Sequence, residues 1–210
     1  MITTIGIGMV GWLTLGICGP AMPVGQSDRP PKVIRCTVPT PKNWERDSIL
    51  EAFKTADELG GWISLPDPVE WWYALGKDAR TAKIFQDSQW QNYLLRENNT
   101  DLFIQLDPYG SPRQGTLSSK LPDELAGSTF ASPAIREAFV REAVARVEWY
   151  QPKYVCLAME INAYYEQQPD DFDHFVSLFA EARQAIKSVN PEAIVFVSFQ
   201  YEQLLGRFGG

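Results

Sequence analysis

Short apolar runs alternate along this chain with segments that have helical periodicity. The runs are apolar on both faces and rich in β-branched and aromatic residues, which is typical of strands buried in a parallel sheet. We expect strands at residues 33–38, 62–65, 101–106, 154–159 and 194–199. Strands of this kind, separated by helices, form α/β folds. The alternation predicts either an open doubly wound sheet or the parallel β/α units of a TIM-type barrel.

The segments between the runs carry the signals that start and stop helices. In chain order, we expect helices at residues 43–59, at 81–96, from Pro133 onward behind a Ser132 cap, and at 170–189. The faces that we expect to be buried follow the spacing of an amphipathic helix. They are Ile49, Phe53 and Ala56 in the first helix, Val140, Val144 and Val147 in the third, and Phe172, Phe175, Phe179, Ala182 and Ile186 in the last.

The composition narrows the classes of function. Of the 210 residues, 45% are hydrophobic, which is enough for one sizeable core, and 26 acidic residues outnumber 19 basic ones. The basic residues form no cluster, so we expect no nucleic-acid partner. One histidine and three scattered cysteines predict neither a metal site nor a cofactor, which leaves carboxylates to carry acid–base chemistry. No glycine-rich phosphate loop follows a strand, and this favours the barrel over a nucleotide-binding sheet.

The first 22 residues form an apolar leader. Its length and small-residue ending are typical of a secretory signal, although no Lys or Arg precedes the apolar run. Glycines interrupt the run, so we expect no membrane contact beyond this leader. A cleaved leader predicts a secreted or periplasmic protein, and an incidental one a cytoplasmic protein. Residues 23–31 are polar and proline-rich and predict a linker, followed by the folded domain at residues 32–210.

Polar and aromatic side chains follow the carboxyl ends of the predicted strands. In a parallel sheet these ends meet at one edge, where barrel enzymes keep their active sites. Carboxylates among exposed rings suit a sugar site, because acids act on the glycosidic oxygen and flat rings stack on pyranose faces. The alternative is that the rings pack onto the ends of helices. The candidate substrate-binding residues are Arg35, Trp71, Trp72, Tyr109, Asn162, Tyr164, Gln200 and Tyr201.

Residues 154–162, with the sequence YVCLAMEIN, resemble the fourth-strand segment of the clan of (β/α)8-barrel retaining glycoside hydrolases that includes endo-galactanases and many cellulases. The similarity extends through residues 172–189 into 195–199. In that clan the fourth strand ends in Asn-Glu, and the Glu is the general acid/base. The resemblance therefore implies a TIM-type barrel and gives this role to Glu160. Met159 stands where the clan has Asn, and Asn162 is the nearest substitute for its hydrogen bond to the sugar.

The chain departs from that clan in its number of strands. A complete barrel has eight strands, and the clan's nucleophile lies on the seventh, whereas only five are predicted here. We therefore expect an incomplete barrel, truncated after the fifth strand, that lacks this nucleophile unless Glu202 or Asp107 serves as the second carboxylate. The expected activity of the complete form is hydrolysis of a glycosidic bond in an oligo- or polysaccharide, so the expected partner is carbohydrate.

Other functions stay open on the sequence alone. One is a non-catalytic, carbohydrate-binding or partner-dependent half-barrel, and another is a barrel hydrolase or aldolase-type enzyme without sugar specificity. A second acid within about 5–10 Å of Glu160 would favour the glycosidase, because that chemistry needs two carboxylates at such a spacing. An incomplete sheet would also leave a raw edge, through which we expect self-association.

Overall fold

The computed structural model describes residues 36–43, 45–59, 62–69, 71–76, 101–109, 117 and 121–206. The chain divides into two compact units, Met1–Val33 and Ile34–Gly210, and every described residue belongs to the second unit. The predictions for the leader, the linker, Arg35 and the helix at 81–96 lie outside the described residues.

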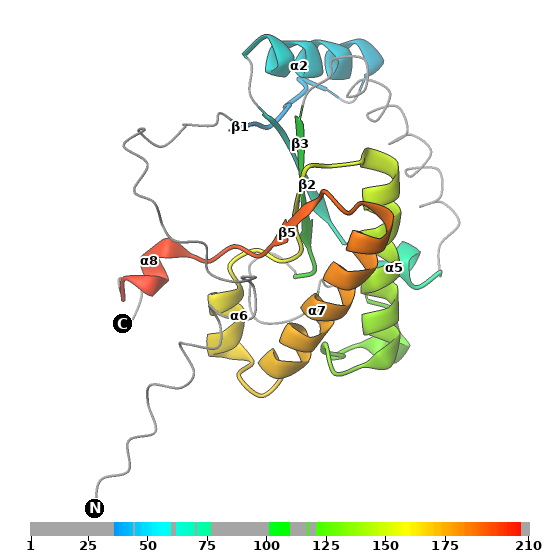
Figure 1. Ribbon diagram of the computed structural model, residues 1–210, viewed down its shortest axis with the longest axis vertical. Coiled ribbons are helices and arrows are strands. Elements are labelled where there is room, and N and C mark those ends of the chain that lie inside the picture. The colour runs from blue at the N-terminus through cyan, green and yellow to red at the C-terminus, as the bar shows by residue number, and fades with distance from the viewer. Residues whose placement is uncertain are drawn as a thin grey trace, which may run out of the picture. The chain divides into compact units, whose positions relative to one another are not determined.

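A five-stranded parallel sheet forms the centre of this unit (Figure 1). Its strands lie in sequence order, each paired in parallel with the next. The predicted α/β class is therefore confirmed. In a doubly wound sheet the order of the strands reverses at one point, whereas the order of the five described strands does not reverse. The strands are β1 (Cys36–Thr37), β2 (Trp62–Pro68), β3 (Asp101–Asp107), β4 (Tyr154–Cys156) and β5 (Ile194–Phe196).

Helices follow the strands, as the alternation predicts. The longer ones are α2 (Arg46–Leu59), α5 (Pro133–Tyr150) and α7 (Phe172–Val189). Helices α5 and α7 lie side by side against one face of the sheet (Figure 1). The shorter ones are α3 (Trp71–Ala74), the 3-10 turn η1 (Asp123–Leu125), α6 (Ile161–Gln167) and α8 (Tyr201–Leu204). None of the described helices is long and apolar enough to cross a bilayer.

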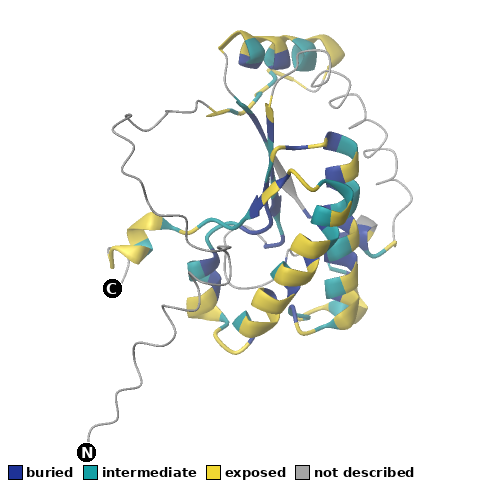
Figure 2. Cartoon of the chain, in the orientation of Figure 1, coloured by how far each residue is buried: buried dark blue, intermediate teal, exposed yellow. Residues whose placement is uncertain are grey.

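The core lies between the sheet and the long helices (Figure 2). Along β3 the residues alternate, so that Leu102, Ile104 and Leu106 are buried and the residues between them are half-buried. Ile104 is in register with the buried Val155 of the next strand. The predicted faces of α2 and α7 are confirmed in their buried members, which are Phe53, Ala56, Phe175, Ala182 and Ile186.

The predicted face of α5 is confirmed in its buried member, Val147, while Val140 is half-buried against the core and Val144 is half-buried. The helix also buries Glu142 and Arg146 as an ion pair, with 2.8 Å between Arg146 Nε and Glu142 Oε1. Hydrophobic spacing cannot identify buried positions that charged residues occupy, so this pair was not predicted.

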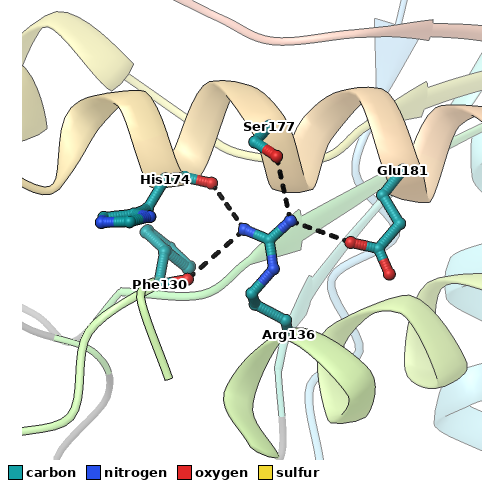
Figure 3. Close-up of polar contacts among 5 residues, drawn as sticks. All are labelled: Phe130, Arg136, His174, Ser177 and Glu181. Carbon is teal, nitrogen blue, oxygen red and sulfur yellow. Dashed lines mark hydrogen bonds and ion pairs between the residues drawn. The ribbon is translucent and has the colours of Figure 1, made fainter. Parts of the chain in front are cut away.

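Helix α5 is tied to α7 by Arg136 (Figure 3). Its guanidinium donates to the carbonyl of His174 at 2.8 Å and to the Ser177 hydroxyl at 3.1 Å, and it pairs with Glu181 at 2.9 Å. A longer bond, 3.5 Å, reaches the carbonyl of Phe130. His174 itself is exposed, and only its carbonyl takes part in this contact.

The turn before α5 is held by Asp171, the residue that precedes α7, and not by the predicted Ser132 cap. Ser132 occupies the N-cap position, but its side chain makes no capping hydrogen bond. The amides of Phe130 and Ala131 donate instead to the carboxylate of Asp171, at 2.9 and 3.1 Å. Asp171 immediately precedes α7, so one carboxylate joins the starts of the two helices.

The second face of the sheet carries half-buried aromatic rings. The rings of Trp62 and Tyr154 stack with 3.9 Å between centroids, and those of Phe103 and Phe196 stack at 5.6 Å. Towards the carboxyl ends of the strands this face becomes polar, and Gln105 Nε2 donates to Ser64 Oγ at 2.8 Å. We call the surface formed by the following residues the second face: Trp62, Ser64, Phe103, Gln105, Tyr154, Cys156 and Phe196.

Candidate functional site

The backbone of Glu160 has an unusual conformation at the point where β4 leads into α6. Glu160 has φ 53° and ψ 47°, which is the left-handed region. For a residue with a side chain this conformation costs about 1–2 kcal/mol. Such residues persist only where the surrounding structure fixes them, and they gather at functional sites. The predicted acid/base residue thus occupies a strained position at the carboxyl end of the fourth strand.

Ser198 holds this corner in place. The amide of Glu160 donates to Ser198 Oγ at 3.0 Å. The amide of the next residue, Ile161, donates to the Ser198 carbonyl at 3.0 Å, and the Ser198 amide donates to the Ala158 carbonyl at 3.1 Å. One residue just beyond β5 therefore serves three backbone groups around Glu160.

A second contact joins the same two segments. Asn162 Nδ2 donates to the carbonyl of Gln200 at 3.1 Å, and Asn162 Oδ1 accepts from the Gln200 amide at 2.8 Å. We expected both residues to bind substrate, but the structure gives the Asn162 amide group and the Gln200 backbone to each other. We call the contacts of residues 158–162 with Ser198 and Gln200 the corner clamp.

Asp107 lies close enough to this corner for its charge to act on Cys156. Burial raises the pKa of the Cys156 thiol to about 11, against lowering contributions from hydrogen bonds with Ala158 and Ser198. The negative charge of Asp107 raises this pKa further. Asp107 Oδ1 also accepts from the amide of Tyr109 at 3.3 Å, which is a turn-forming contact. A second carboxylate therefore stands at the end of β3, where its charge acts on Cys156.

Three of the predicted sugar-stacking rings are buried, and the prediction is wrong for them. Trp71 has no exposed surface, and its indole donates to the Pro108 carbonyl at 3.2 Å. The rings of Tyr109 and Tyr164 stack on each other at 5.0 Å, and the Tyr164 hydroxyl donates to Asp171 at 2.6 Å. Because neighbouring side chains cover these rings, they cannot stack on a pyranose. The alternative, packing onto the ends of helices, holds for them.

Other candidate residues are exposed. Trp72 and Tyr201 keep 42% and 66% of their surface accessible, and Glu202 is exposed in the first turn of α8. Helix α8 contacts α6, which brings Tyr201 and Glu202 to the side of the corner clamp. Phe199, which the prediction did not include, is 48% exposed just beyond Ser198.

The sequence contained a signal for Ser198 that the prediction did not use. Ser198 is the one polar residue in the run 194–199, IVFVSF, and such a residue in an apolar strand needs a hydrogen-bond partner. Of the two cysteines in the described residues, Cys36 is exposed and Cys156 is buried.

The described residues contain no group of three or more His, Cys, Asp or Glu side chains that could hold a metal ion. The candidate site consists of Glu160, Asp107 and the corner clamp. No protein-family model matches the chain, and no curated protein matches it at a significant level.

Proposed function

We propose that the sheet is part of a (β/α)8-type barrel and that Glu160 is the general acid/base of a glycoside hydrolase site. The observation that carries this proposal is the strained, clamped backbone of Glu160 at the carboxyl end of β4. The sequential order of the parallel strands supports the barrel, because closing such a sheet on itself is the common way to cover its second face.

In the proposed reaction, the Glu160 carboxyl group gives its proton to the glycosidic oxygen as the bond from that oxygen to the anomeric carbon breaks. A second carboxylate then acts in one of two ways. It bonds to the anomeric carbon, giving a glycosyl-enzyme that water cleaves, or it removes a proton from a water that attacks the anomeric carbon. Asp107 suits this second role better than Glu202, because Asp107 is half-buried near the corner clamp and Glu202 is exposed on α8. A separation of about 5–5.5 Å would predict retention, and about 6.5–9.5 Å inversion.

A second candidate function is carbohydrate binding without catalysis. The hydrogen bond from the Tyr109 amide to Asp107 favours it, since this bond gives that carboxylate a turn-forming role. The exposed rings of Trp72 and Tyr201 would then provide stacking surfaces for the sugar.

The test compares Glu160→Gln with Glu166→Gln, a matched change at an exposed position on α6, the short helix that Glu160 precedes. The full chain is assayed for hydrolysis on a panel of polysaccharides and aryl glycosides, and for binding on a glycan array. We expect E160Q to lower kcat on ordinary glycosides about 10²–10⁴-fold, with a much smaller loss on activated aryl glycosides, because their leaving groups need little protonation.

The E166Q control should keep the activity of the unchanged protein. Binding without hydrolysis would favour the second candidate function. A chain that neither hydrolyses nor binds any glycan would contradict both functions.

A further inference from the structure

We infer that Ser198 is a positioning residue that holds Glu160 in its left-handed conformation and thereby sets the direction in which its side chain leaves the backbone. The catalytic part of this inference rests on the proposed function. The conformational part stands on the geometry alone.

The first step concerns how the backbone groups of the corner are satisfied. In a regular parallel ladder, an amide of one strand donates to a carbonyl of the next. Here the Ser198 carbonyl is taken by the amide of Ile161, and the Ser198 hydroxyl takes the amide of Glu160. Two successive amides of the turning chain are thus bound by one residue, the Glu160 amide by its hydroxyl and the Ile161 amide by its carbonyl.

The second step concerns rigidity. The Ser198 amide donates to the Ala158 carbonyl, and the Asn162 side chain hydrogen-bonds to both the amide and the carbonyl of Gln200. Hydrogen bonds therefore hold the chain before Glu160 at Ala158, at Glu160 itself, and after it at Asn162. These bonds offset the cost of the left-handed backbone.

The third step connects position to chemistry. A general acid must lie within hydrogen-bond reach of the oxygen that it protonates, and a small misplacement of such a group can cost a large factor in rate. The Glu160 side chain leaves the backbone at the corner, so φ and ψ at this residue set the direction of its Cα–Cβ bond and thereby the positions that its carboxylate can reach. Loss of the Ser198 hydroxyl should therefore lower kcat with little change in KM.

The experiment measures the backbone of Glu160 by NMR in the full chain. Two observables are followed: the hydrogen-exchange rate of the Glu160 amide, and the strong NOE between its own amide and Hα protons that a positive φ produces. In Ser198→Ala we expect exchange at Glu160 to be roughly 5–10-fold faster, from the loss of one hydrogen bond, and the NOE to weaken.

Two variants serve as controls. Ser198→Thr keeps the hydroxyl and should restore both observables. Ser188→Ala removes a hydroxyl that donates to the Ala185 carbonyl on the exposed side of α7, and it should leave Glu160 unchanged. If S198A does not fold, the unchanged protein decides, because an unprotected Glu160 amide or a weak NOE would overturn the inference.

The catalytic part is measured on any glycoside that the unchanged protein hydrolyses. A fall in kcat for S198A, restored in S198T, supports the positioning role. Normal kcat in a variant whose Glu160 backbone has moved would overturn that role while leaving the proposed function intact. A changed Glu160 backbone in a protein without any glycosidase activity would refute the proposed function and support only the conformational part.

Discussion

Glu160 and Asp171 are both carboxylates that directly precede a helix, but their surroundings differ. Asp171 is buried and accepts hydrogen bonds from Thr129, Phe130, Ala131 and Tyr164. It therefore contributes to the fold. Glu160 is half-buried on a left-handed backbone that costs stability. Under the proposed function its carboxylate serves chemistry.

The strain at Glu160 can be measured by replacing it with glycine. Glycine adopts the left-handed conformation without a steric penalty but is costly inside a helix. We expect Glu160→Gly to raise the free energy of unfolding by about 0.5–1 kcal/mol, since the relief of strain exceeds the added entropy of the unfolded chain. Glu166→Gly, inside α6, should lower it by about 1 kcal/mol. Urea denaturation of both variants checks this, and equal destabilisation would show that Glu160 is not strained.

The bond between Tyr164 and Asp171 makes a second prediction at this scale. Tyr164→Phe leaves a buried carboxylate oxygen with one donor fewer, and should lower the free energy of unfolding by about 1–3 kcal/mol. The neighbouring Tyr165 is 51% exposed, so Tyr165→Phe should change it by less than about 0.5 kcal/mol.

The same pair predicts a dependence on pH. Burial, followed by the hydrogen bond and the charge of Asp171, raises the pKa of Tyr164. The folded state then keeps this phenol neutral at a pH where the unfolded chain ionises it, near 10. Stability is therefore retained below pH 10 and lost above it, with a slope of about 1.4 kcal/mol per pH unit for this one proton. Y164F should show a shallower loss above pH 10, and identical slopes would contradict the assignment.

At the scale of elements, the contact between α5 and α7 depends more on backbone carbonyls than on charge. Arg136 is largely covered, but its partner Glu181 keeps 51% of its side chain exposed, which makes the ion pair weak. Arg136→Ala should lower the free energy of unfolding by about 1–3 kcal/mol, since it leaves the carbonyl of His174 without this donor. Glu181→Ala should cost less than about 1 kcal/mol. The reverse order, measured in urea, would show that the ion pair dominates.

The sequence predicted those elements whose pattern is set by hydrophobicity. Strands β2 and β3 and helices α2 and α7 follow from apolar runs and amphipathic spacing. Helix α6 was missed, because residues 161–167 contain polar and aromatic side chains that resembled a binding loop. The roles of Asn162 and Trp71 were missed for a related reason, since both are defined by distant backbone carbonyls, those of Gln200 and Pro108. The resemblance of residues 154–162 to a glycoside hydrolase segment selected Glu160, whereas its left-handed backbone has no sequence signal.

For the whole molecule, the order of the strands has consequences for association. Within the described residues, β5 pairs only with β4, so it forms one edge of the sheet, and Ile194 on it is 48% exposed. The second face adds half-buried rings next to this edge. Such an edge is a template for pairing with another chain.

We therefore expect the full chain to self-associate at micromolar concentration. Ile194→Lys should shift the population towards the monomer, because a charge on an edge strand opposes pairing. Light scattering coupled to size-exclusion chromatography measures both proteins. A monodisperse, monomeric unchanged chain would contradict the prediction, and Val176→Lys, at an exposed position on α7, is the control for added charge alone.

The corner clamp also bears on how such a fold can be inherited. Glu160 is separated from Ser198 by 38 positions, and Asn162 is separated from Gln200 by the same number. The acid belongs to the fourth β/α unit, while the groups that fix it belong to the fifth. A recombination event that exchanged the fourth unit alone would bring in a glutamate whose support is missing. Units four and five should therefore be transmitted as a pair, and chimaeras that split them should fold without an ordered acid.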